Sequence, residues 1–112
     1  MTAEKRYLVN ITQGAADDLE AIHAYTADQR SLDDADTLLD SLYERVETLE
    51  YFSLRGSMVP EATEVGNREV RQILHLPYRL IYHVAQDRVA IMAIVDGRRD
   101  VQTLLKGRLL AP

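Results

Sequence analysis

Four arginines stand in or beside predicted strands, where they could converge on one anionic partner surface. They are Arg71, Arg79, Arg98 and Arg99. The planar guanidinium group makes paired hydrogen bonds to carboxylate or phosphate and stacks on aromatic rings. The other interpretation is structural: Arg71 and Arg79 pair with Glu69, with Asp96 or with the acidic helices, while the last two arginines solubilise a turn. The residue types alone leave both interpretations open.

The remaining candidate side chains have no catalytic or metal-binding motif around them. His23, His75 and His83 lack the spacing of a metal site, and no carboxylate at a suitable offset completes one. His83 lies in an arginine-bearing strand and could act as an acid or base toward RNA. We expect Tyr78 and Tyr82, two residues apart on that strand, to pack in the core rather than stack on bases. No metal or cofactor is predicted.

A predicted β-hairpin carries three of the four arginines. Residues 78–84 and 89–95 are rich in aromatic and β-branched residues, and a four-residue turn, residues 85–88, joins them. The second run leads through Gly97 directly into Arg98 and Arg99. Because this run is apolar at every position, we expect a central strand that is covered on both faces, by a helical hairpin on one of them.

The N-terminal part of the chain predicts one strand and two helices. Residues 7–11 have the alternation of a strand, and Thr12 is the expected N-cap of the helix that follows. Ser31 is the expected N-cap of a second helix, in which apolar side chains recur every three or four residues as far as Leu49. The short connection between the helices predicts an antiparallel hairpin whose apolar seam rests on a sheet or on its own partner.

The other segments complete the predicted order. Residues 55–67 contain two glycines and a proline without a clear period, which indicates a loop. Residues 68–75 predict a strand, Pro77 marks a turn, and residues 101–110 predict a short final helix. The length suits one α+β domain, residues 1–112, in the order strand, helix, helix, three strands and a short helix.

Charge is divided unevenly along the chain. The net charge of −5 argues against a protein whose main role is to grip nucleic-acid backbone. Residues 1–64 carry 5 basic and 14 acidic side chains, whereas residues 65–112 carry 8 basic and 4 acidic ones. An acidic helical half and a basic sheet half would give the domain a directional field that steers a partner.

Two absences narrow the class of protein. The sequence contains no cysteine, which excludes a disulfide framework, a thiol nucleophile and thiolate metal sites. No apolar run approaches the roughly 18 residues of a membrane-spanning helix, and the polar N-terminal residues do not resemble a signal peptide. We expect a cytoplasmic protein that makes no membrane contact.

The order of elements and three motifs resemble the RelE/ParE superfamily of bacterial toxins from type II toxin–antitoxin systems. Residues 78–84, YRLIYHV, are similar to the family's YRxxYxV strand, and residues 95–100, VDGRRD, to the ParE-type ending VHGRRD, with Asp96 in place of the histidine. Residues 16–25 resemble the family's first helix. The resemblance covers nearly the whole chain and implies the β-α-α-β-β-β-(α) fold, with a small twisted sheet of about four strands and the helical hairpin packed on it.

The resemblance also implies a protein partner. Toxins of this kind are neutralised by a small antitoxin, here a ParD-like one, whose extended C-terminal segment wraps the toxin. An apolar helical seam and a basic sheet suit a helix laid in a groove together with an added strand or turn. The implied antitoxin contacts are on the second helix and one strand: Leu39, Leu42, Val46, Leu49 and Arg79.

The superfamily divides by target, and the C-terminal residues indicate the branch. RelE-like members cleave messenger RNA in the ribosome, using basic residues of the sheet and a tyrosine or histidine of the C-terminal segment. After Arg99 this chain has neither residue type. ParE-like members lack that set, and the best known of them inhibit DNA gyrase by binding, without catalysis. We therefore expect a non-enzymatic ParE-like gyrase inhibitor that has no sequence-specific nucleic-acid binding of its own.

The expected target contacts are Arg98 and Arg99, with Arg71 and Arg79 as further candidates. The first alternative is a ribosome-dependent messenger-RNA endoribonuclease of RelE type, which would use Arg71, Arg79 and His83. The second alternative is an interaction module without toxicity.

Overall fold

The computed structural model describes residues 6–60, 64–65, 68–97 and 101–110. Its elements are β1 (Leu8–Ile11), α1 (Gln13–Gln29), α2 (Leu32–Glu47), the 3₁₀ helix η1 (Thr48–Glu50), β2 (Ser57–Met58), β3 (Glu64–Val65), β4 (Arg68–His75), β5 (Tyr78–Ala85), β6 (Arg88–Asp96) and α3 (Val101–Leu110). The predicted α+β class and the order of the main elements are confirmed. No helix in this described part of the chain is long and apolar enough to span a membrane.

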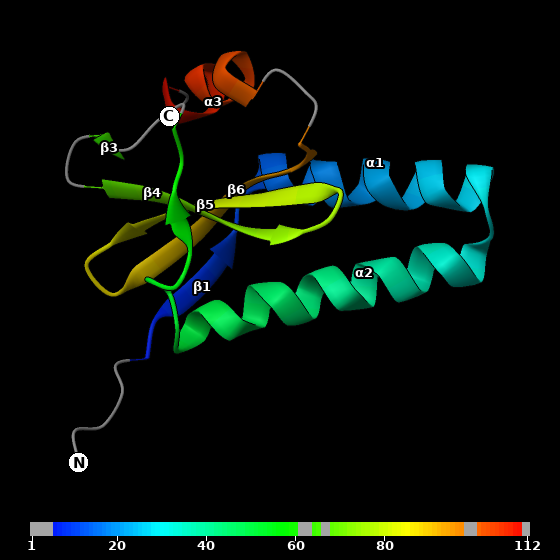
Figure 1. The fold of residues 1–112 in the computed structure, drawn as a ribbon, viewed down its shortest axis with the longest axis horizontal. Coiled ribbons are helices and arrows are strands. Elements are labelled where there is room, and N and C mark those ends of the chain that lie inside the picture. The colour runs from blue at the N-terminus through cyan, green and yellow to red at the C-terminus, as the bar shows by residue number, and fades with distance from the viewer. Residues whose placement is uncertain (1–5, 61–63, 66–67, 98–100, 111–112) are drawn as a thin grey trace.

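The strands form one mixed sheet in the order β1-β6-β5-β4-β2, and β3 also pairs with β4 (Figure 1). The first strand of the chain, β1, lies parallel to the last, β6, while the other neighbours are antiparallel. Strands β1, β4, β5 and β6 make up the expected sheet of about four strands. The loop predicted for residues 55–67 is wrong in part because β2 and β3 lie there. At two residues each, they are too short to show a period.

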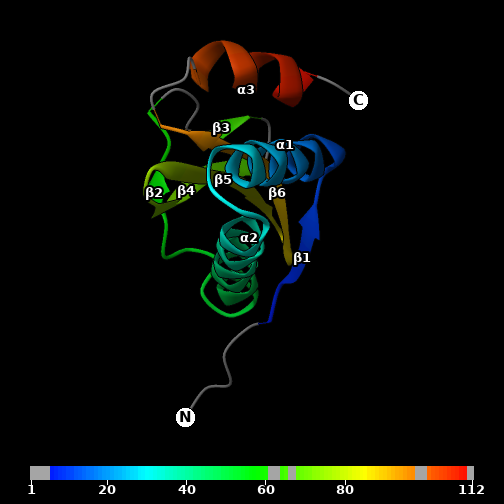
Figure 2. The ribbon, with the colours of Figure 1, turned by 90° about the vertical axis from the view of Figure 1, so that its right-hand side faces the viewer.

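Both helices of the N-terminal hairpin begin at the predicted caps. The Thr12 hydroxyl oxygen accepts a hydrogen bond from the Ala15 amide at 3.3 Å, and the Ser31 hydroxyl oxygen accepts one from the Asp34 amide at 3.0 Å. Each contact satisfies a backbone donor that the first turn of a helix leaves unpaired. Helices α1 and α2 then run antiparallel beside the sheet (Figures 1 and 2).

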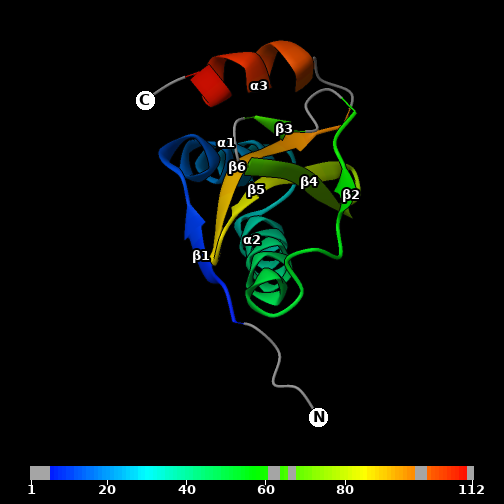
Figure 3. The same ribbon diagram turned by 90° about the vertical axis from the view of Figure 1, so that its left-hand side faces the viewer.

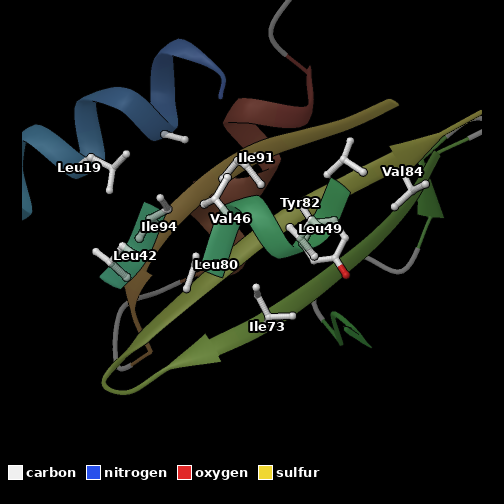
Figure 4. Close-up of a cluster of buried hydrophobic side chains, with 12 residues drawn as sticks. Leu19, Leu42, Val46, Leu49, Ile73, Leu80, Tyr82, Val84, Ile91 and Ile94 are labelled. Atoms are coloured by element: carbon white, nitrogen blue, oxygen red, sulfur yellow. The ribbon is translucent and has the colours of Figure 1, made fainter. Parts of the chain in front are cut away.

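The hairpin covers one face of the sheet and forms the larger core. Leu42 and Val46 of α2 and Leu49 of η1 are buried against the sheet. There, Leu80 and Tyr82 of β5 are completely buried (Figure 4). The apolar stripe of α2 thus packs on the sheet. The sequence had left open whether the stripe packs on a sheet or on its own partner.

A second, smaller core lies on the opposite face of the sheet, beneath α3. Val101 and Leu105 of α3 are buried in one cluster with Ile81 and Ala93 of the sheet and with three valines, Val59, Val70 and Val95. Figure 3 shows α3 on the far side of the sheet from α2. The expected covering of β6 on both faces is therefore observed, and α3 supplies the second cover.

A bulge in β6 divides its apolar residues between the two cores. Ile81 is paired with Ala93 and the next residue, Tyr82, with Ile91, so Met92 is an extra residue in β6. Before the bulge, Ile91 faces the α1–α2 side, and after it Ala93 faces α3. In a regular strand these two side chains, two residues apart, would point to the same face, so it is the bulge at Met92 that places them on opposite faces.

Buried Tyr82 fastens the segment between η1 and β2 to the sheet. Its hydroxyl donates to the Ser53 carbonyl at 2.7 Å and accepts from the Gly56 amide at 3.2 Å. Burial raises the pKa of Tyr82, so the hydroxyl stays neutral and keeps both roles. At Gly56 a Cβ atom would lie well inside van der Waals contact with the Gln72 carbonyl oxygen and the Tyr82 hydroxyl. Only glycine fits at this crossing.

We predict that Gly56→Ala lowers the free energy of unfolding by about 1–3 kcal/mol, because the added methyl group overpacks a site walled by backbone. The matched control is Gly107→Ala in α3, where a Cβ would meet nothing within 4 Å. There the better helix propensity of alanine should stabilise the protein by up to about 1 kcal/mol. Urea unfolding measures both values, and equal effects at the two positions would contradict the close approach at Gly56.

Candidate functional site

The structure places the predicted arginines on different faces of the sheet. Arg71 shares the α1–α2 side of β4 with core residue Ile73, while Arg79 shares the α3 side of β5 with core residue Ile81. The expectation that these two guanidinium groups converge on one surface is therefore wrong. The register between strands, which sets the sidedness, is invisible in the local sequence.

Arg71 has a structural position. Its guanidinium group pairs with Glu69, and its Nη1 donates to the carbonyls of Gly56 at 2.6 Å and of Leu54 at 3.3 Å. The side chain is only 20% exposed. These bonds hold the segment that Tyr82 also holds, which agrees with the structural interpretation of this arginine.

Arg79 lies beside the strand end that leads to the arginine pair. Its Nε donates to the Gln72 side-chain oxygen at 2.6 Å, and a Cβ at Gly97 would lie 3.5 Å from its side chain. The Gly97 amide donates to the Pro77 carbonyl at 2.9 Å, which anchors the end of β6 on the β4–β5 turn. Arg98 and Arg99 themselves lie outside the described residues. Their role therefore rests on the sequence.

The implied antitoxin contacts on α2 are core residues. Leu42 and Leu49 are completely buried, Val46 is 4% exposed, and Leu39 packs partly buried against the same cluster. Their burial leaves a partner little apolar surface on the stripe, although Val46 also lines the groove between β1 and α2. Their part in antitoxin binding stays a prediction.

Among the described residues, no group of histidine and acidic side chains could hold a metal ion. His23 instead joins the two helices of the hairpin, with its Nε2 at 2.8 Å from an Asp36 carboxylate oxygen. Tyr78 packs at the edge of the core, and burial together with the nearby Asp96 carboxylate raises the pKa of its hydroxyl. Its neutral side chain therefore has a packing role, as expected.

A partly buried ion pair lies at the open edge of β6, and no local feature of the sequence indicates it. The pairing of β1 with β6 ends at Ile91, where the chain turns into α1. Farther along, the Asp18 carboxylate accepts from the Ile94 amide at 2.9 Å, and the Arg108 guanidinium donates to the Met92 carbonyl at 2.8 Å. These two side chains take over the hydrogen bonds of the missing neighbour strand.

Asp18 and Arg108 also bind each other through two hydrogen bonds, at 2.6 and 2.8 Å. Their side chains are 10% and 23% exposed, respectively. The hydrogen bond to Asp18 raises the pKa of Arg108, so the guanidinium group stays charged. The contact connects α1, β6 and α3 at one point.

Two grooves lie beside the helical hairpin. The larger, of about 660 Å³, lies between β1 and α2 and is lined mainly by Tyr7, Val9, Tyr43 and Glu47. The other, of about 370 Å³, lies between α1 and the open end of β6 and includes Tyr25, Tyr78 and Asp96. Neither Arg71 nor Arg79 lines either groove.

The geometry defines a small α+β domain with a helical hairpin on one face of its sheet, and sequence comparison agrees with it. Residues 9–101 match the family model described as the ParE toxin of the type II toxin–antitoxin system, parDE. The chain belongs to the ParE toxin family. No curated protein matches its sequence.

A solved structure supports the fold. A chain described as the chromosomal ParDE toxin–antitoxin system from P. aeruginosa superimposes with a TM-score of 0.66 at 21% sequence identity. The match covers 81% of this chain and 96% of the other. At this identity the likeness concerns the arrangement of helices and strands, and it confirms the fold class expected from the sequence.

We predict that Asp18→Asn and Arg108→Met each lower the free energy of unfolding by about 2–4 kcal/mol, because each leaves a charged or polar partner without its counterpart in a largely buried site. Urea unfolding of the single and double variants forms a double-mutant cycle. The expected coupling energy is about 1–3 kcal/mol. Additive effects would mean that the two side chains do not depend on each other.

Proposed function

We propose that this ParE-family toxin stops growth by binding DNA gyrase, without catalysis of its own, and that a ParD-like antitoxin neutralises it. The observation that carries this proposal is the C-terminal segment. From Asp100 to Pro112 the sequence contains no tyrosine or histidine, the residue types that the resemblance assigns to proton transfer in the nuclease branch. The arginine pair that precedes this segment is then a docking contact.

The positions of Arg71 and Arg79 support the same choice. A ribosome-dependent nuclease that used both would need them near one phosphate group, yet they lie on opposite faces of the sheet. Arg71 is also engaged with Glu69 and two backbone carbonyls. The endoribonuclease alternative therefore lacks a shared basic surface from these two residues.

Purified toxin should inhibit the ATP-dependent supercoiling of relaxed plasmid by gyrase in a concentration-dependent way, because the proposed activity requires only binding. Primer extension on messenger RNA after toxin expression serves as the second measurement. We expect no cuts positioned at codons. Unchanged supercoiling at a large molar excess of toxin, together with such cuts, would favour the endoribonuclease.

The double variant Arg98→Glu/Arg99→Glu should lose most of its toxicity in cells while the fold persists, because charge reversal replaces attraction to an acidic surface by repulsion. The control is Arg88→Glu at the exposed first residue of β6, which should remain as toxic as the wild type. Circular dichroism checks the fold of each variant. Unfolding of the double variant would assign the pair a structural role.

A further inference from the structure

The segment that joins η1 to β2 exposes several large apolar side chains in close succession. Tyr51, Phe52, Leu54 and Met58 are 47%, 53%, 53% and 38% exposed, respectively, and we call these four residues the apolar platform. None of them belongs to either core cluster. Single exposed apolar residues are common on protein surfaces, but four within eight positions form a patch.

The inward-facing residues of the segment show why the platform points outward. Ser53, Gly56 and Val59, three residues apart, are all buried. Because every third residue points toward the sheet, the residues between them point toward the solvent. The platform is thus a regular product of the backbone path, and its exposure does not result from one displaced side chain.

The sheet holds this segment firmly from below. The Tyr82 hydroxyl binds the Ser53 carbonyl and the Gly56 amide, and the Arg71 guanidinium group binds the carbonyls of Leu54 and Gly56. Close packing at Gly56 leaves no room for the backbone to shift inward. Because the loop is already ordered, a partner would lose little conformational entropy on binding to it.

Two arginine side chains lie at the border of the platform. Arg55 is exposed and forms no ion pair with any carboxylate of the described residues; its guanidinium group donates to the Thr48 hydroxyl at 2.8 Å. Arg6 pairs with Glu50, and its guanidinium carbon lies 6.0 Å from the centre of the Tyr51 ring. Aromatic and aliphatic anchors bordered by arginine are the usual composition of a binding hot spot. The complementary partner presents apolar side chains next to carboxylates.

We propose that the apolar platform is a docking site for an apolar, acid-flanked segment of the antitoxin. This inference rests on the proposed function, which supplies a partner that stays bound while the toxin is stored. A fixed apolar patch suits a permanent partner better than a transient target, since long-lived interfaces are the more hydrophobic ones. The platform also begins directly after α2 and η1, so it offers the accessible apolar surface that the buried stripe of α2 does not.

The test compares two double variants that remove similar exposed apolar groups. Phe52→Ser/Leu54→Ser alters the platform, whereas Leu32→Ser/Leu76→Ser alters residues that are 61% and 82% exposed elsewhere. The binding partner is the protein encoded beside the toxin gene, purified after co-expression, and affinity is measured by isothermal titration calorimetry. We expect the platform variant to bind at least ~30-fold more weakly and the control to bind as the wild type does. Both should keep the wild-type melting temperature and arrest growth.

A charge test accompanies the apolar one. Arg55→Glu should weaken antitoxin binding, with a larger effect at low than at high salt, while Arg88→Glu should not. Equal affinity of the platform variant and the wild type would overturn the proposed site. Loss of growth arrest with antitoxin binding intact would also overturn it, because the platform would then face the target. If the neighbouring gene product neither binds nor neutralises the wild-type toxin, the proposed function itself fails.

Discussion

The open edge of β6 is the constraint on which the rest of the structure depends. A central apolar strand cannot leave its backbone groups unpaired in a largely buried place, yet β1 accompanies it only as far as Ile91. The carboxylate of Asp18 and the guanidinium group of Arg108 complete the edge and bind each other. These hydrogen bonds hold α1 and α3 on β6. The helices on the two faces of the sheet are therefore joined by one polar contact between two apolar clusters.

The use of apolar surface within the fold decides which surfaces remain for partners. The stripe of α2 packs on the sheet, and the apolar side of α3 packs on the opposite face. Among the described residues, exposed apolar side chains are most closely spaced in a short segment after α2, which Tyr82 and Arg71 fasten to the sheet. A small domain buries only part of its apolar surface in its own core, so large apolar side chains that stay exposed are available to a partner.

Local signals predicted well what local interactions determine. Thr12 and Ser31 were recognisable as caps, because a cap satisfies the backbone of its own helix. Strands β4 and β5 and the β5–β6 hairpin could be expected from composition and turn residues. The opposite sides of Arg71 and Arg79 could not, because sidedness across strands depends on register and on where a bulge falls. Met92 carries no mark of a bulge in the sequence.

The candidate site was harder to predict than the fold, for the same physical reason. Asp18 looks like an ordinary acidic residue early in a helix, and Arg108 like a surface residue of the last helix; only the folded chain brings them into contact across ninety positions. The stripe of α2 was recognised as a seam that needs a cover, but its period does not say whether that cover is internal. Burial in the structure answers this question.

The parallel pairing of β1 with β6 has a consequence for the synthesis of the toxin. The first strand finds its neighbour only after nearly the whole sheet has left the ribosome, because residues 8–11 bond to residues 88–91. Such pairing raises the contact order and delays the completion of the fold. A growing chain that still lacks β6 has no place for β1 and no anchor for α1. During synthesis there is therefore an interval, set by the order of the strands, in which the nascent toxin has not reached its native form.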